Sequence, residues 1–376
     1  MASNLKHLSV HAKKKDSLDH IHDAIGYNYR MPEIEAAIAN EQLKKLEKLN
    51  QIRSRLSKYL MSELLEFNFL EGPTIKEGCE HGFYLFPIKY KQKETGLSTG
   101  LKQNGAVTVA TTESRLEELR RQATTAQLFD VEANILTANQ VKKLYPIVDT
   151  TDVIGGVHMP LDGQADPVGV TNVLAKAARI HGATIIEKCP VLKILIKNNR
   201  ISGVETSQGK IECEFIVLAT GMWSRQLAAD VNVSIPLYPD EHFYILTEPL
   251  EGIDKSLPVL RDYNHCLYIK EDAGKLLVGI FEPNAKPAFL DTNRVPDDFS
   301  FGEFPEDFDH FEPYLMYAIK RIPILKKTGI RKFFSGPESF TPDTNYLLGE
   351  TPEVKNFFVC CGFNSIGLVS SGGAGR

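Results

Sequence analysis

Several features that mark common classes of protein are scarce or missing in this sequence. No uninterrupted apolar stretch is long enough for a membrane-spanning helix, so we expect no membrane span. The formal net charge is −5 at pH 7, whereas nucleic-acid-binding proteins are usually basic, so we expect no nucleic-acid partner. The start of the chain is basic but has no apolar core, which argues against a secretory signal.

Cysteine is present without any pattern that binds a metal. The cysteines form no CxxC pair and have no metal-ligand spacing, so we predict no metal site. Unpaired thiols are typical of a reducing compartment. We therefore expect a soluble intracellular protein, in the cytoplasm or, in a eukaryote, in the mitochondrial matrix. The cysteines are Cys79, Cys189, Cys213, Cys266, Cys360 and Cys361.

What the sequence does contain is typical of a globular protein with more than one domain. It has 376 residues, of which 43% are hydrophobic and 24% charged, enough for two domains and a sizeable core. The first part is mildly basic and the remainder acidic. A polar segment punctuated by glycines, residues 90–105, separates the two parts and indicates a linker.

The end of the chain is its most informative part. An apolar strand expected at residues 357–361 runs into a glycine-rich turn, residues 362–367, and then into a helix made of small residues. Glycines let the backbone approach a planar or anionic ligand closely, and a helix start offers free N–H donors. A second motif, Gly-Pro-Glu-Ser-Phe-Thr-Pro-Asp at residues 336–343, precedes it. Together they predict a ligand-binding turn.

These two motifs resemble those of the glycine-oxidase-like (D-amino-acid oxidase type) FAD oxidoreductases, and especially the dimethylglycine and sarcosine dehydrogenase group. The resemblance extends back to about residue 105. It implies an FAD cofactor and a small N-methyl amino acid as substrate, which loses a hydride from its N-methyl carbon; the imine then hydrolyses to formaldehyde. The residues that the resemblance assigns to FAD in this turn are Gly362, Phe363, Asn364, Ser365 and Gly367.

The middle of the chain carries a further segment of this kind. We expect a strand at residues 184–187 and a three-strand meander at residues 191–196, 203–206 and 211–219, which ends in Ala-Thr-Gly. Such an ending resembles the second dinucleotide motif of this flavoprotein class. From the residues alone, a buried strand with a tight turn is an equally good interpretation. The resemblance assigns to the cofactor Val191, Thr220, Gly221 and Trp223.

A set of alternating segments between residues 242 and 279 predicts an antiparallel sheet, and the resemblance makes this sheet the substrate-binding part. The resemblance makes His242 and Tyr268 the catalytic residues. They are expected to position the substrate carboxylate or to keep the amine neutral, because a protonated amine cannot release a hydride. Tyr244 and Arg261 are further substrate contacts. For a single histidine such as His242, a structural role is an equally good interpretation.

The first ninety-five residues resemble a different family. A long amphipathic helix is expected at residues 32–65 and a strand at residues 82–88. With the preceding polar block, they resemble the C-terminal part of the DegT/DnrJ-type sugar aminotransferases, which use pyridoxal phosphate (PLP). The resemblance assigns Asn28 to the PLP phosphate, with Arg30 nearby. Because no lysine stands in the family's Schiff-base context, we predict that stable PLP binding is absent.

The first FAD-binding motif of the oxidoreductase family, G-x-G-x-x-G between a strand and a helix, does not occur in this sequence. We therefore expect weak or no FAD binding and a flavin domain that is incomplete at both ends. Three functions stay open. They are an FAD-dependent amine oxidoreductase, active or inactive; a non-catalytic regulatory protein similar to the pyruvate dehydrogenase phosphatase regulatory subunit; and a relative of PLP aminotransferases.

The predicted fold combines α/β and α+β features. It is a partial FAD-linked oxidoreductase fold with a mixed sheet, a β-meander and an antiparallel substrate-domain sheet, preceded by a small fragment of helix and strands. The predicted domains are residues 1–95, a linker at 96–105, and residues 106–376. The sequence identifies no protein partner.

Overall fold

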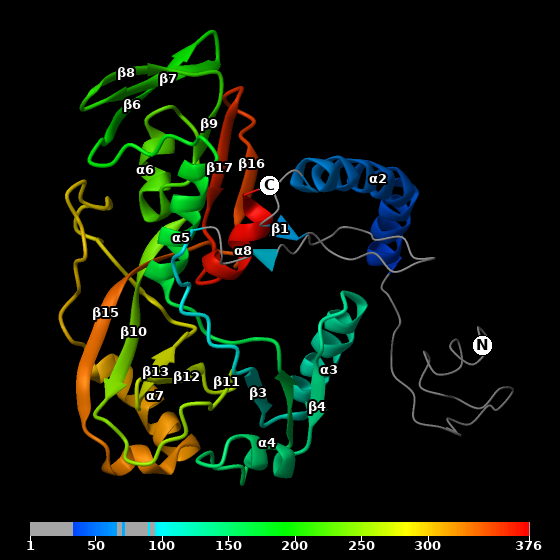
Figure 1. Cartoon of the computed structure of the whole chain (residues 1–376), viewed down its shortest axis with the longest axis vertical. Helices are drawn as coiled ribbons and strands as arrows, with labels where there is room; N and C mark the ends of the chain where they lie inside the picture. The colour runs from blue at the N-terminus through cyan, green and yellow to red at the C-terminus, as the bar shows by residue number, and fades with distance from the viewer. Residues whose placement is uncertain (1–32, 66–69, 72–88, 91–94, 376) are drawn as a thin grey trace, which may run out of the picture. The chain divides into compact units, whose positions relative to one another are not determined.

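A computed structural model of the chain describes residues 33–65, 70–71, 89–90 and 95–375 (Figure 1). Contacts divide the chain into two units, Met1–Lys91 and Gln92–Arg376. In the first unit, helix α2 (Glu33–Leu65) agrees with the predicted helix, and strand β1 (Leu70–Glu71) pairs with β2 (Lys89–Tyr90). The strand expected at residues 82–88 lies outside the described residues.

The second unit is built around a nine-stranded sheet. Its strands are β3 (Ala106–Ala110), β4 (Asn134–Leu136), β5 (Gly155–Met159), β10 (Tyr238–Thr247), β11 (Val259–Asp262), β12 (Leu267–Asp272), β13 (Lys275–Ile280), β14 (Lys286–Pro287) and β15 (Ile330–Phe340). The strand order is β14-β10-β13-β12-β11-β3-β5-β4, and β15 pairs along the other edge of β10. Neighbours are antiparallel except β11 and β3, which are parallel, so the sheet is mixed.

One face of this sheet forms the main hydrophobic core. Successive residues of a strand point to opposite faces, so Phe243 and Ile245 point to one face and their neighbours to the other. Phe243 and Ile245 are buried in a cluster with Phe311 and Ala318 of helix α7 (Phe308–Arg321), which covers this face. The opposite face of the same strands is left to carry polar side chains.

The second unit also contains a smaller sheet. It consists of β16 (Leu347–Glu350), β17 (Phe357–Cys361) and β9 (Ile216–Leu218), with β17 in the middle and parallel to β9. The helices beside its loops are η1 (Gly221–Trp223), α6 (Ser224–Ala229) and α8 (Gly367–Ala374). A separate antiparallel meander follows α5 (Pro167–Ile180), with strands β6 (Val191–Lys197), β7 (Arg200–Thr206) and β8 (Gly209–Glu212).

Two strand predictions in this region are wrong. Residues 184–187 form no strand: Ile185 and Ile186 are exposed, and an apolar pair cannot make a strand without a neighbour to hydrogen-bond. The predicted third meander strand, residues 211–219, is divided between two sheets. Its first half is β8, and its second half turns away as β9 to pair with β17.

Local signals in the sequence were more reliable. Asn198 and Asn199 adopt φ values of 54° and 57°, as a tight hairpin turn requires. Thr137 and Gln140 form the predicted capping box at the start of α4 (Ala138–Leu144). The other helices are α3 (Glu113–Leu128) and η2 (Pro323–Lys327). No helix in the described part of the chain is both long and apolar enough to cross a membrane.

The segment predicted as a linker is attached to the second unit. The backbone of Lys102 exchanges hydrogen bonds with Gln164, and the N–H of Gly105 donates to the carbonyl of Asp162 at 2.9 Å. The Lys102 ammonium also pairs with Glu271 at 2.5 Å. Long-range contacts that no local composition signals therefore fasten Lys102 and Gly105 in this segment.

Candidate functional site

A row of paired residues crosses the polar face of the nine-stranded sheet. In register, Phe334 pairs with Tyr244, Tyr244 with Gly279, Gly279 with Tyr268, and Tyr268 with Arg261. Residues directly opposite each other in neighbouring strands share one face. The register therefore brings the predicted substrate residues of three strands to the same face of the sheet. His242 is the fourth predicted residue, and it shares that face because it stands two positions before Tyr244 in β10.

His242 and Tyr268 are in contact on this face. The distance from His242 Nε2 to the Tyr268 hydroxyl oxygen is 3.1 Å, and the two rings are parallel within 2°. Phe281 packs against both rings, with centroid distances of 4.7 Å and 5.3 Å. Gly279 makes the contact possible, because a Cβ at that position would lie 2.0 Å from Cζ of Tyr268. The Tyr268 ring thus lies across a glycine to reach His242.

Both members of this pair are uncharged at neutral pH. Burial lowers the pKa of His242 to about 4, so its imidazole is neutral. Burial also raises the pKa of Tyr268 well above its usual value, so its hydroxyl keeps its proton. A neutral imidazole beside a phenol can both donate and accept hydrogen bonds without adding charge to the site.

The other two predicted substrate contacts differ from each other. Tyr244 stacks on Phe334, with ring centroids 4.5 Å apart. Arg261 lies in the same row, but its Nη2 is 3.2 Å from Oδ2 of Asp162. Its guanidinium is therefore already paired with a carboxylate. Tyr244 therefore belongs to the aromatic surface around His242, whereas Arg261 lies further along the face.

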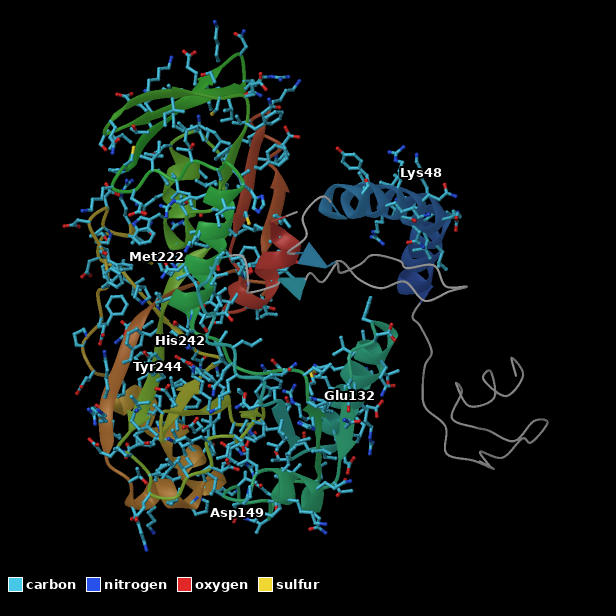
Figure 2. All side chains as sticks on the ribbon, viewed as in Figure 1. Lys48, Glu132, Asp149, Met222, His242 and Tyr244 are labelled. Atoms are coloured by element: carbon cyan, nitrogen blue, oxygen red, sulfur yellow. The ribbon has the colours of Figure 1, made fainter. Side chains whose placement is uncertain are left out.

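A pocket of about 320 Å³ opens beside His242. It connects the sheet face with η1, the short helix that follows β9, and Figure 2 labels Met222, His242 and Tyr244 in this area. Met222 and Glu338 are not among the site residues predicted from the sequence. A signal for Glu338 existed, since it is the one carboxylate within the β15 sequence. The lining residues are Met222, His242, Phe334, Gly336, Pro337, Glu338 and Ser339.

The loops predicted to bind the cofactor lie at one edge of the smaller sheet. Because β9 and β17 are parallel, their carboxyl ends meet at the same edge, which is where ligands bind in such sheets. Thr220 and Gly221 follow β9, and Gly221 adopts a φ of 53° that favours glycine. Trp223 donates from Nε1 to the carbonyl of Pro296 at 3.1 Å. The turn that begins at Gly362 follows β17.

Hydrogen bonds fasten this second turn to the end of β15. Asn364 Oδ1 accepts from the N–H of Thr341 at 2.8 Å, and Asn364 Nδ2 donates to the carbonyl of Gly362 at 2.6 Å. Burial raises the pKa of the Glu338 carboxyl, and the hydroxyl and N–H of Ser365, which lies against it, favour the charged form and so partly lower that pKa. Phe363 stacks on Tyr346, with ring centroids 4.9 Å apart. The two sequence motifs that suggested a ligand-binding turn are therefore one physical unit.

The residues at this edge fit part of a dinucleotide cofactor. A Cβ at Gly362 would lie 2.6 Å from Cγ2 of Thr341, so the turn leaves no room for a side chain. No side chain caps the start of α8, and the N–H groups at Gly367 and beyond can bind anionic oxygens. Val191 begins β6, in a different sheet from both loops. Asn28 and Arg30 lie outside the described residues. Within the described residues, no cluster of His, Cys, Asp or Glu could hold a metal.

Fold and site define a class of protein. A mixed sheet that carries a buried polar pair, next to glycine-rich loops at the ends of parallel strands, is the architecture of a flavin-linked oxidoreductase. The family model described as FAD dependent oxidoreductase matches residues 71–376, and the chain belongs to this family. The predicted fold class and this part of the predicted resemblance are confirmed.

Individual relatives narrow the comparison. Human mitochondrial sarcosine dehydrogenase is 39% identical over 76% of this chain and 31% of its own length. The mouse mitochondrial pyruvate dehydrogenase phosphatase regulatory subunit is 35% identical over 76% of this chain and 32% of its own. The chain thus spans about a third of the length of these curated relatives. Among solved structures, L-proline dehydrogenase from P. horikoshii has a TM-score of 0.65 and 25% identity, covering 76% of this chain and 72% of that one.

The resemblance of residues 1–95 to an aminotransferase stays a prediction. The family match begins at residue 71, so the last part of that range is matched to the flavin-linked family instead. The assigned PLP contacts lie outside the described residues, and the structure offers no geometry for them.

Proposed function

We propose that the chain is an FAD-dependent oxidoreductase that removes an N-methyl group from a small amino acid such as sarcosine or dimethylglycine. The observation that supports this most is the uncharged pair of His242 and Tyr268, which stands at a pocket beside the expected cofactor loops. The similarity to sarcosine dehydrogenase supports the same chemistry. The neutral pair and the similarity to sarcosine dehydrogenase together support a substrate of the sarcosine type.

The side chains divide the work as follows. A bound FAD would supply the hydride acceptor. Thr220, Gly221 and Trp223 from one loop and the turn at residues 362–367 from the other would hold it. His242 and Tyr268 hydrogen-bond the substrate and fix its orientation relative to the cofactor loops. Because both are neutral, they place no positive charge next to an amine that must lose its own proton before its N-methyl carbon is oxidised.

Two measurements on the purified chain test this proposal. The flavin absorbance bands, at roughly 370 and 450 nm, report cofactor content, and formaldehyde release from sarcosine or dimethylglycine reports turnover. His242→Ala and Tyr268→Phe should lower formaldehyde release much more than flavin content. An equal loss of both quantities would assign the two residues to folding. If flavin-loaded wild type releases no formaldehyde, the proposed function is wrong.

A non-catalytic regulatory protein is the second candidate function. Two observations favour it: the 35% identity to a phosphatase regulatory subunit, and a sequence without the G-x-G-x-x-G motif. A regulatory protein of this type would release no formaldehyde even when saturated with FAD. Flavin-loaded wild-type protein that turns over sarcosine would exclude it.

The division into residues 1–95, 96–105 and 106–376, and the absence of stable PLP binding, are also proposals. Since the segment from Thr99 onward is hydrogen-bonded into the second unit, limited proteolysis should cut before it. Borohydride reduction with PLP, followed by mass spectrometry, should leave no stoichiometric lysine adduct. One specifically labelled lysine would contradict the second proposal.

A further inference from the structure

We propose that Glu338 recognises the amine end of the substrate: its carboxylate pairs with the protonated, N-methylated nitrogen and then accepts the proton. This inference rests on the proposed function and deepens it, because it names the end of the substrate that the pocket binds.

The register of the sheet places Glu338 in the pocket. In β15, Glu338 stands two residues after Gly336, and Gly336 pairs directly with His242 of β10. Residues two apart in a strand share a face, so the Glu338 side chain is on the same face as His242. Both line the pocket of about 320 Å³. Ser365 of the cofactor turn lies next to this carboxylate and favours its charged form.

The carboxylate has no cationic partner among the described residues that line this pocket, which include no Lys or Arg. Arg261 stands on β11, four strands away from β15. At about 4.8 Å per strand the two backbones are roughly 19 Å apart, and the guanidinium already pairs with Asp162. Burial raises the pKa of Glu338, which shows the cost of holding this charge away from water. A bound cation would offset part of that cost.

The surroundings of Glu338 favour an alkylated cation over a bare one. Phe334 lines the pocket and stacks on Tyr244, and the rings of Phe281 and Tyr268 surround His242. Aromatic faces attract N-methylated ammonium groups, whose positive charge is spread over the methyl carbons. A negative carboxylate that shares a pocket with the aromatic ring of Phe334 is thus suited to an N-methyl ammonium and unsuited to a substrate carboxylate.

The proton step is balanced and involves no redox change. The N–H bond of the substrate ammonium breaks, an O–H bond forms on Glu338, and the nitrogen regains its lone pair. The ion pair becomes a neutral amine beside a neutral carboxylic acid. A carboxylate whose pKa burial has raised is a better acceptor for this proton than an exposed one.

The test uses two small probes and measures their dissociation constants by ligand-observed NMR, with the full chain and FAD added in excess. N,N-dimethylglycinamide is cationic at neutral pH and carries no carboxylate. Isovalerate is the carbon isostere of dimethylglycine and carries no amine. The variants are Glu338→Gln, Ser365→Ala and Asp240→Asn. Asp240 is the matched control, because it pairs with Glu338 in register yet does not line the pocket.

We expect the wild type to bind the amide cation and Glu338→Gln to bind it about tenfold or more weakly, since a charge-assisted contact is lost. Ser365→Ala should have a smaller effect in the same direction, because the backbone N–H of Ser365 still favours the charged carboxylate. Asp240→Asn should bind like the wild type. Isovalerate should bind weakly, and no more weakly to Glu338→Gln than to the wild type.

Three results would overturn the inference. They are tighter binding of isovalerate than of the amide cation, equal losses in Glu338→Gln and Asp240→Asn, and no saturable binding of the cation to the wild type. Formaldehyde release that is the same in wild type and Glu338→Gln would also overturn it while leaving the proposed function intact. If the cation binds in a Glu338-dependent way but no formaldehyde is released, the proposed function is wrong and the inference about Glu338 stands.

Discussion

The substrate face of the nine-stranded sheet and the cofactor edge of the three-stranded sheet are built differently. Behind the substrate face lies a complete core, in which Phe243 is 0% exposed and helix α7 covers the strands. On the smaller sheet, apolar side chains of the strands stay partly open, with Val217 63% exposed and Leu348 49% exposed. Sheets with parallel strands are usually covered on both faces. The substrate face is therefore organised by its own packing, whereas the cofactor edge depends more on what binds there.

The same difference appears in how each site is held. Tyr268 reaches His242 across Gly279, in the middle of a sheet that continues on both sides. The cofactor turn is held instead by one side chain, Asn364, which hydrogen-bonds to Thr341 and to the carbonyl of Gly362. Packing within a sheet resists local opening better than a few hydrogen bonds in a loop do. We expect changes at the two sites to have different consequences.

FAD affinity should show the largest effect. The sequence has no G-x-G-x-x-G motif, and each charge-assisted hydrogen bond contributes about 1.5–3 kcal/mol. Losing three or more should weaken FAD binding at least about a thousandfold relative to a family member with the motif. Fluorescence titration of both proteins with FAD measures the difference. Copurification of one equivalent of FAD with this chain would show that the cofactor edge is sufficient as it stands.

Acid should destabilise the substrate face through His242. Because burial lowers its pKa from 6.5 to about 4, the unfolded chain binds the proton more readily than the folded chain does. Its contribution to the free energy of unfolding is present above pH 6.5, falls as the pH drops, and is lost below about pH 4. The total is up to ~3 kcal/mol.

Denaturant titrations of wild type and His242→Gln across this range isolate the histidine. The wild type should lose more stability than the variant between neutral pH and about pH 4. Tyr268→Phe serves as the control, since it removes the hydroxyl but keeps a buried histidine. Identical pH slopes for wild type and His242→Gln would contradict a buried, neutral imidazole.

A glycine-to-alanine substitution can be made in both regions, so its effect on stability can be compared between them. In Gly279→Ala, the new methyl group would meet the Tyr268 ring, which must leave His242. We expect a loss of about 1–3 kcal/mol in the free energy of unfolding. Gly372 of α8 has open space around it, so Gly372→Ala should be neutral or should stabilise by about 0.5–1 kcal/mol. Thermal unfolding that ranks the two variants in the opposite order would refute the account of Gly279.

The smallest effect is expected at the cofactor turn itself. Asn364→Ala removes the hydrogen bonds to Thr341 and Gly362 at a residue with a φ of 47°, which asparagine tolerates better than alanine. We expect a local loss of about 1–2 kcal/mol. Hydrogen exchange should accelerate in residues 362–366 and stay unchanged in β10. Faster exchange in β10 as well would show that the two regions are not independent.

The sequence predicted those elements whose signals are local. The helix at residues 33–65, the capping box at Thr137 and the hairpin at Asn198 follow from periodicity, caps and turn residues. The prediction from sequence was wrong where the choice of partner strand determined the structure. The segment at residues 211–219 has the composition of one strand, yet β8 and β9 find partners in different sheets. No residue within that segment indicates which partner it will take.

The candidate site shows the same division. The sequence by itself determined which side chains are available: a histidine and a tyrosine in apolar strands, a glutamate in β15, and glycines after β9 and β17. Only the tertiary structure decided that Tyr268 crosses Gly279 to meet His242 and that Glu338 lines the same pocket as His242. Register is the physical reason, because a shift of one residue would turn each of these strand side chains to the opposite face.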